Sequence, residues 1–174
     1  MILDIARLLF FPALMAFAAA SDMFTMKISN RLSIALVAGF VVLAFADGMA
    51  AMTILGHVGA AALVLLVTVF CFSRGWMGGG DAKMASAVAL WFGFEHLLEF
   101  LLWASLLGGV LTLLLLQFRR WPLPLMLTGR AWVERLHRKG GGVPYGIALA
   151  ASALLIYGDT GWVRSVGPAL NLLR

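Results

Sequence analysis

The chain has 174 residues, of which 63% are hydrophobic and only 12% are charged. A soluble domain carries about 25% charged residues, so this composition excludes an ordinary soluble protein and indicates an integral membrane protein. The net charge of +5 does not indicate nucleic-acid binding, because the basic residues fall between hydrophobic segments and not along one polar face. The single cysteine excludes an internal disulfide and a zinc site built from several thiolates.

Six apolar stretches follow one another along the chain. They cover residues 2–21, 31–47, 52–72, 82–93, 97–118 and 143–158. The longer ones reach the ~20 residues that a helix needs to cross the hydrocarbon core. We expect the first stretch to be a retained helix and not a cleaved signal peptide, because its start is only weakly basic and further spans follow at once. We therefore predict an all-α, polytopic membrane protein with six transmembrane helices in a single domain over residues 1–174. The short fourth helix is entered through a glycine-rich loop, so we expect it to begin inside the membrane.

The distribution of charge predicts how these helices are oriented. With the segments 22–31, 73–83 and 119–142 on one side of the membrane, that side holds ten basic and three acidic residues, whereas the other side holds three basic and five acidic residues. Basic residues accumulate in cytoplasmic loops. We therefore predict that the first side is cytoplasmic, that 119–142 is a cytoplasmic basic loop, and that both termini face outward.

This orientation places two acidic residues at the same membrane edge, Asp22 after the first helix and Asp81 at the start of the fourth. Two carboxylates that face each other cannot both ionise, so such a pair shares one proton. One carboxylate can then activate water while the other protonates the leaving amine of a peptide bond, which is aspartic-protease chemistry without a metal or cofactor. Gly78, Gly79 and Gly80 fit this interpretation, because a backbone without side chains lets a substrate strand or a partner helix approach Asp81.

The same residues carry a family resemblance. The segment "GGGD" at 78–81 matches the pattern GxGD, and it occurs with "DMFTMKISN" at 22–30, "GDAK" at 80–83 and "VPYG" at 143–146. Together these segments resemble those of type IV prepilin peptidases, over essentially the whole chain. The resemblance implies that Asp22 and Asp81 are the catalytic pair. The residues expected to support the site are Gly78, Gly79, Gly80, Lys83, Lys27, Asn30, Pro144, Tyr145 and Gly146.

The chain departs from the family pattern in two places. The usual Ile-Pro-Asn segment is Ile28-Ser29-Asn30 here, so a looser turn is expected before the second helix. Bifunctional members carry a cytoplasmic insert with paired cysteines that bind zinc and accompany N-methylation, and no such insert is present in these 174 residues. The chain resembles instead the short form associated with tight-adherence (Flp-type) pili.

The resemblance to the short form implies a reaction, partners and a location. The expected reaction is cleavage of the leader peptides of prepilins or pseudopilins after a glycine, at the cytoplasmic face of the bacterial inner membrane, with no cofactor and no methyltransferase activity. The expected partners are these leader peptides and membrane lipids, and no nucleic acid is expected. The sequence is compatible with both a monomer and a homo-oligomer.

Other interpretations compete with this one. A presenilin-type protease also uses GxGD, but its partner acid follows a tyrosine, whereas Ser21 precedes Asp22 here. A Ser/Lys peptidase would use Ser86 and Lys83, which share a helix face. A small proton- or cation-coupled transporter or scaffold would use Asp22 and Asp81 as a relay, although the sequence shows no pseudo-symmetry between halves. A purely structural interpretation makes the aspartates an interfacial anchor and a helix cap.

Four further features are expected to be structural. The segment "EHLLE" at 95–99 has metal-ligand residue types but is interpreted as a polar interfacial cap. His57 is expected to be a satisfied core or interface histidine. Residues 130–139 have an amphipathic pattern that predicts an interfacial helix on anionic lipid. Five tryptophans near span ends are interpreted as an interfacial belt. They are Trp76, Trp91, Trp103, Trp121 and Trp162.

Overall fold

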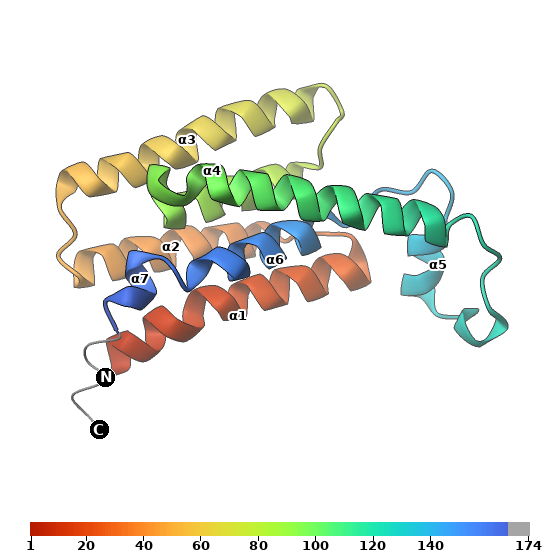
Figure 1. Ribbon diagram of the computed structural model, residues 1–174, viewed down its shortest axis with the longest axis horizontal. Helices are drawn as coiled ribbons and strands as arrows, with labels where there is room; N and C mark the ends of the chain where they lie inside the picture. Colours follow the sequence, from red (N-terminus) through yellow and green to blue (C-terminus); the bar gives the residue numbers. More distant parts are fainter. Residues whose placement is uncertain (167–174) are drawn as a thin grey trace.

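The computed structural model describes residues 1–166, which contain helices and connecting turns and no strand. The first four helices are α1 (Ile2–Thr25), α2 (Asn30–Ala46), α3 (Ala51–Ser73) and α4 (Gly79–Phe118). They are followed by the 3-10 helix η1 (Leu125–Leu127), α5 (Ala131–His137), α6 (Tyr145–Tyr157) and α7 (Gly161–Arg164). The long helices lie side by side in a bundle, and α5 lies at the end opposite to the N-terminus (Figure 1). The expected outward position of the C-terminus concerns residues outside those described.

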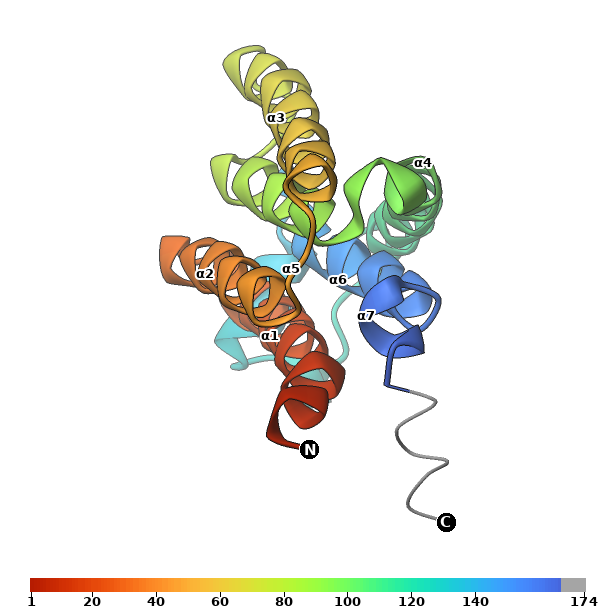
Figure 2. The same cartoon turned by 90° about the vertical axis from the view of Figure 1, so that its left-hand side faces the viewer.

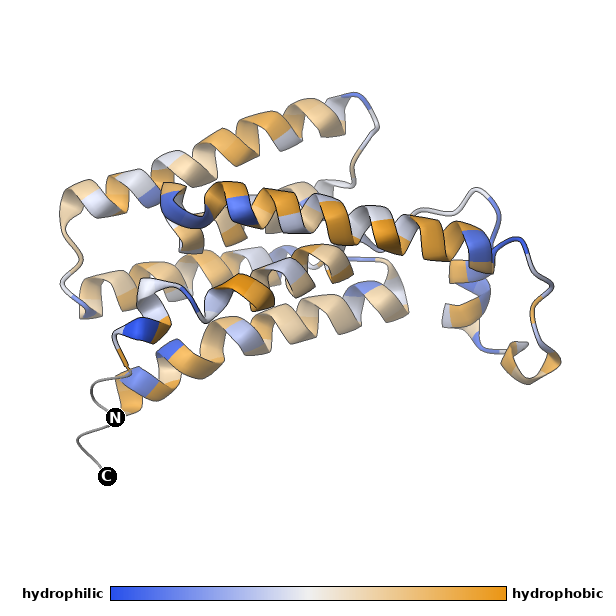
Figure 3. Ribbon diagram, viewed as in Figure 1, coloured by the Kyte–Doolittle hydropathy of each residue, from blue (hydrophilic) through white to orange (hydrophobic). Residues whose placement is uncertain are grey.

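The exterior of the bundle is apolar. Leu66, Leu98 and Leu113 are 73%, 69% and 69% exposed, and hydrophilic residues gather toward the ends of the long helices (Figure 3). By length and composition α1, α3 and α4 can each cross a membrane, and α2 and α6 are shorter apolar helices. An apolar exterior of this kind is suited to a lipid environment. The prediction of an all-α, polytopic membrane protein is confirmed, and the number of spans stays a prediction.

Helix α4 is broken at Gly93, whose φ of 59° and ψ of −167° are not helical. Its two halves lie beside each other, because Asp81 from the first half and Thr112 from the second line the same cavity. In a straight helix these two residues would be separated by about 46 Å. Figure 2 shows the turn between the halves. The six apolar stretches of the sequence thus correspond to α1, α2, α3, the two halves of α4, and α6.

Side chains from other helices satisfy the backbone at this break. The carbonyl of Leu90 accepts a hydrogen bond from His57 Nδ1 at 2.7 Å, and the carbonyl of Trp91 accepts one from Trp162 Nε1 at 2.9 Å. Since an unpaired carbonyl is costly in an apolar environment, these two donors stabilise the turn. His57 is half-buried and hydrogen-bonded, so the prediction of a satisfied core or interface histidine is confirmed for its hydrogen bonding. Trp91 and Trp162 are 1% and 5% exposed, so their assignment to an interfacial belt was wrong.

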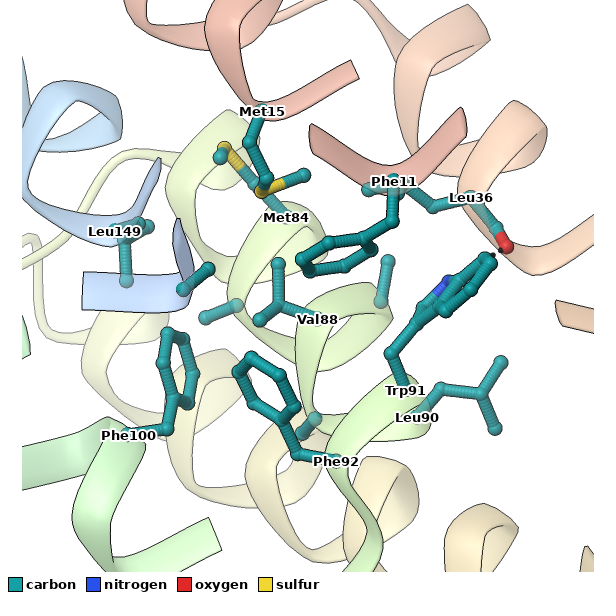
Figure 4. Packing of buried hydrophobic residues seen from close by; sticks show 14 of the residues in the cluster. Phe11, Met15, Leu36, Met84, Val88, Leu90, Trp91, Phe92, Phe100 and Leu149 are labelled. Carbon is teal, nitrogen blue, oxygen red and sulfur yellow. Dashed lines mark hydrogen bonds between the residues drawn. The ribbon is translucent and has the colours of Figure 1, made fainter. Parts of the chain in front are cut away.

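The first half of α4 forms the centre of the core. Every residue from Met84 to Gly93 is buried, as expected for a helix that is apolar on all sides. Figure 4 shows these side chains between those of α1 and α6, with Phe11 beside Trp91 at 5.0 Å between ring centroids. Trp91 Nε1 also donates a hydrogen bond to the carbonyl of Leu36 at 3.0 Å. This packing holds the first half of α4, whose first turn carries Asp81, against its neighbours.

The connections of the bundle alternate between its two ends. Residues 26–29, 74–78 and 119–144 lie at one end, whereas 47–50 and the break in α4 lie at the other (Figure 1). This arrangement brings the three basic segments of the sequence to one end of the molecule, as the charge pattern requires.

Helix α5 packs against the protein through its apolar face. Val133 is 3% exposed, and the ring of Trp132 contacts that of Phe24 edge-on, with 5.5 Å between centroids. Arg135 Nη1 donates a hydrogen bond to the carbonyl of Phe24 at 2.7 Å. The prediction that this segment lays its apolar face on lipid was therefore wrong, because that face covers the end of α1.

Candidate active site

Asp22 lies near the end of α1 and is 4% exposed. Its Oδ2 accepts a hydrogen bond from the backbone N–H of Gly146 at 2.7 Å. Gly146 belongs to the first turn of α6, where N–H groups have no partner within the helix. The start of a helix is also a favourable place for an acidic group. Helix α6 thus orients the carboxyl group of Asp22.

The segment that begins α6 is fitted closely to its surroundings. Pro144 is buried and is the N-cap residue of α6. Tyr145 packs over Gly108 of α4, where a Cβ would overlap the Tyr145 hydroxyl. At Gly146 a Cβ would lie 2.8 Å from Asp22 Oδ2 and 3.1 Å from Asp22 Cβ. Only glycine lets the start of α6 come so close to Asp22.

Asp81 occupies the third position of α4, and its carboxyl group turns back toward the N-cap residue Gly78. A Cβ on Gly78 would lie 2.8 Å from Asp81 Oδ2. An acidic side chain at this position commonly faces the free N–H groups of the first turn. The structural interpretation of residues 78–81 as a helix start therefore describes the local geometry correctly.

Asp22 and Asp81 line one cavity of about 300 Å³, together with Gly80 and the turn 26–28. A second cavity, of about 660 Å³, reaches Asp81 from the other side. It lies between the end of α3, the second half of α4 and the start of α6, and Tyr145 lines it. Asp81 therefore separates a small pocket that it shares with Asp22 from a larger space that can hold a segment of polypeptide.

Gly80 allows the turn between α1 and α2 to lie close to α4. A Cβ on Gly80 would be 3.1 Å from Ile28 Cβ and 3.4 Å from the Ile28 carbonyl oxygen. Met26, at the start of this turn, has a φ of 53°, and Ser29 at its end caps α2 by accepting the N–H of Arg31 at 3.2 Å. The turn that lines the pocket is thus held at both of its ends.

The other residues predicted to support the site lie around the two aspartates. Lys27 lines the small cavity. Lys83 Nζ donates a hydrogen bond to Asn30 Oδ1 at 2.9 Å, which links α4 to the start of α2. At Gly79 a Cβ would lie 3.3 Å from the ring of Phe72. Lys83 and Asn30 therefore fix the position of two helices at the site and do not line the small cavity.

Two alternative sites lack the required geometry. Ser86 Oγ donates its hydrogen bond to a carbonyl of its own helix at 2.8 Å, while Lys83 is bound to Asn30, so these residues do not form a Ser/Lys pair. His96 lies 3.5 Å from Glu99, near the break in α4 and at the other end of the bundle. Among residues 1–166, no group of three or more His, Cys, Asp or Glu side chains is arranged to hold a metal ion.

Arg119 was not among the site residues predicted from sequence, because it belongs to the segment 119–142, which was expected to be a cytoplasmic basic loop. It is 7% exposed and binds three carbonyl oxygens, whereas the neighbouring Arg120 is exposed. Two adjacent arginines carry the same signal in sequence, and only the packing of the chain distinguishes them.

The model of the type IV leader peptidase family matches residues 9–113. The match includes both aspartates and the glycines before Asp81, and it ends before the basic segment 119–142 and the start of α6. No curated protein and no solved structure matches the chain significantly.

Proposed function

The chain belongs to the type IV leader peptidase family, and on this premise we propose that it is a membrane-embedded aspartic endopeptidase that uses Asp22 and Asp81. Its substrates are the leader peptides of type IV prepilins or pseudopilins of the Flp type. One observation carries the proposal: two acidic residues far apart in sequence, from α1 and α4, line the same small cavity.

The reaction follows from a pair of carboxyl groups that share one proton. The ionised carboxylate removes a proton from a water molecule in the cavity, and the water oxygen attacks the carbonyl carbon of the scissile peptide bond. The protonated carboxyl group then gives its proton to the nitrogen as the C–N bond breaks. The N–H of Gly146 keeps the Asp22 carboxyl group oriented during these transfers.

The surroundings of Asp81 support access for a peptide. The cavity of about 660 Å³ begins at Asp81 and continues between α3 and the second half of α4. A peptide segment in this space would present its backbone to the aspartate. Gly78, which lines this cavity together with Asp81, leaves the backbone beside the aspartate without a side chain.

The orientation in the membrane is part of the proposal. The aspartates lie at the end of the bundle that carries the three basic segments. Because basic segments stay in the cytoplasm, cleavage takes place at the cytoplasmic face of the bacterial inner membrane.

The decisive experiment replaces each aspartate separately. Asp22→Asn and Asp81→Asn each abolish cleavage of a purified prepilin, because an amide cannot change its protonation state. Asp159→Asn, an exposed acid at the other end of the bundle, is the control and keeps full activity. Cleavage is followed by determining the new N-terminus of the product, and folding by the thermal stability of each variant in detergent.

Two results would contradict the proposal. More than about a tenth of the wild-type rate in either single variant would exclude the pair, since loss of a general acid or base costs 10²–10⁴-fold. A wild-type protein that moves protons or cations but cleaves no prepilin would identify a transporter that uses the same two acids.

A further inference from the structure

Arg119 is a buried cation held entirely by backbone carbonyls. It is 7% exposed, and its Nε donates a hydrogen bond to the carbonyl of Leu136 at 2.7 Å. Its Nη1 and Nη2 donate to the carbonyls of Gly141 and Gly142 at 2.8 Å and 2.7 Å. Burying a charge is costly unless it is hydrogen-bonded, so these three bonds fix the guanidinium and the three carbonyls relative to one another.

The three carbonyls belong to a segment that leads directly into the candidate active site. Leu136 lies in the last turn of α5, where carbonyls lack partners within the helix. Gly141 and Gly142 immediately precede the start of α6. Four residues after Gly142, the N–H of Gly146 contacts Asp22. The segment 141–146 is therefore anchored at one end by Arg119 and at the other by the carboxyl group of Asp22.

We propose that Arg119 is a positioning residue for Asp22, because it fixes residues 141–142 and thereby the first turn of α6, whose Gly146 N–H orients the Asp22 carboxyl group. This role rests on the proposed peptidase function. Arginine is suited to the task because its planar guanidinium presents several donors in a fixed arrangement. A lysine keeps the charge but offers a single compact ammonium group, which cannot reach all three carbonyls.

The test compares Arg119→Lys and Arg119→Gln with the matched control Arg120→Gln, since Arg120 is adjacent and exposed. Prepilin cleavage by each purified variant gives kcat and KM, and hydrogen exchange of backbone amides gives the stability of residues 143–147. For both Arg119 variants we expect kcat to fall by about 10- to 100-fold, the size of effect that a small misplacement of a catalytic group produces. KM stays within about threefold of wild type, and amide exchange becomes faster in 143–147 without a general increase elsewhere. Arg120→Gln leaves kcat, KM and the amide exchange of residues 143–147 as in the wild type.

Several outcomes overturn the proposal. An unchanged kcat, an effect on KM alone, or wild-type exchange at the Gly146 amide each excludes a positioning role. Faster exchange throughout the protein would identify Arg119 as a general stabilising residue, and this result also excludes a positioning role. If Arg119→Gln does not fold, Arg119→Lys decides. Amide exchange does not depend on catalysis, so failure of the wild-type protein to cleave prepilin counts against the proposed function, and unchanged exchange counts against the role of Arg119.

Discussion

Gly146 and Gly80 show how single residues shape the pocket around the aspartates. Gly146 brings the start of α6 against Asp22, and Gly80 brings the backbone of Ile28 against α4. In both cases the missing side chain makes room for another part of the same protein. The glycines before Asp81 were expected to admit either a substrate strand or a partner helix, and the neighbour of Gly80 is a turn of this chain, the one that lines the small cavity.

Gly146→Ala tests this constraint at the residue scale. The new methyl group would lie 2.8 Å from Asp22 Oδ2, closer than a carbon atom tolerates, so either the carboxyl group or the start of α6 must move. We expect cleavage to fall at least about tenfold, as displacement of a catalytic group does. Gly158→Ala, at the other end of α6 with no atom within 4 Å of the new Cβ, is the control. Equal activity in the two variants would show that the contact with Gly146 does not position Asp22.

At the scale of elements, the broken helix α4 contributes two separate parts to the site. Its first half carries Asp81 and is buried on all sides, while its second half forms the far wall of the larger cavity. The second half contacts the start of α6 at Gly108, where Tyr145 lies directly over the helix backbone. A side chain at position 108 would therefore displace the Tyr145 ring from the place it now occupies.

The pair Gly108→Ala and Gly109→Ala tests this contact. A methyl group at 108 overlaps the Tyr145 hydroxyl, so we expect the free energy of unfolding to fall by about 1–3 kcal/mol, the usual cost of overpacking. A methyl group at 109 meets no atom within 4 Å and replaces a helical glycine, so stability is unchanged or slightly higher. Thermal unfolding in detergent and prepilin cleavage, measured on the same preparations, check both statements. Equal unfolding temperatures for the two variants would contradict the predicted packing of Tyr145.

At the scale of the whole molecule, charge is distributed unevenly between the two ends of the bundle. The basic segments and both aspartates lie at one end of the bundle, and the acidic connection near Asp159 lies at the other. If the basic end is cytoplasmic, the aspartates face the cytoplasm.

Thiol labelling in cells measures this orientation. Cys71 is the only cysteine, so a Cys71→Ser background allows single cysteines to be introduced at Met126 and at Asp159, which are both exposed. Met126→Cys should react with a membrane-impermeant reagent only after the inner membrane is opened. Asp159→Cys should react in cells whose inner membrane is intact. The reverse pattern would place the aspartates on the outer face and contradict cleavage at the cytoplasmic face.

The sequence by itself determined the class of the molecule, the order of its apolar helices, the collection of basic segments at one end and the family. These properties follow from local composition and from motifs of a few residues, because each helix needs a continuous apolar run and each charge acts on its own loop. Tertiary structure alone decided which of two adjacent arginines is buried, that Trp91 belongs to the core, and that α5 covers α1. It also decided that Asp22 is held by Gly146, a residue on another helix. Such contacts depend on the spatial proximity of distant segments, and the residue types involved also occur elsewhere in the chain with no such role.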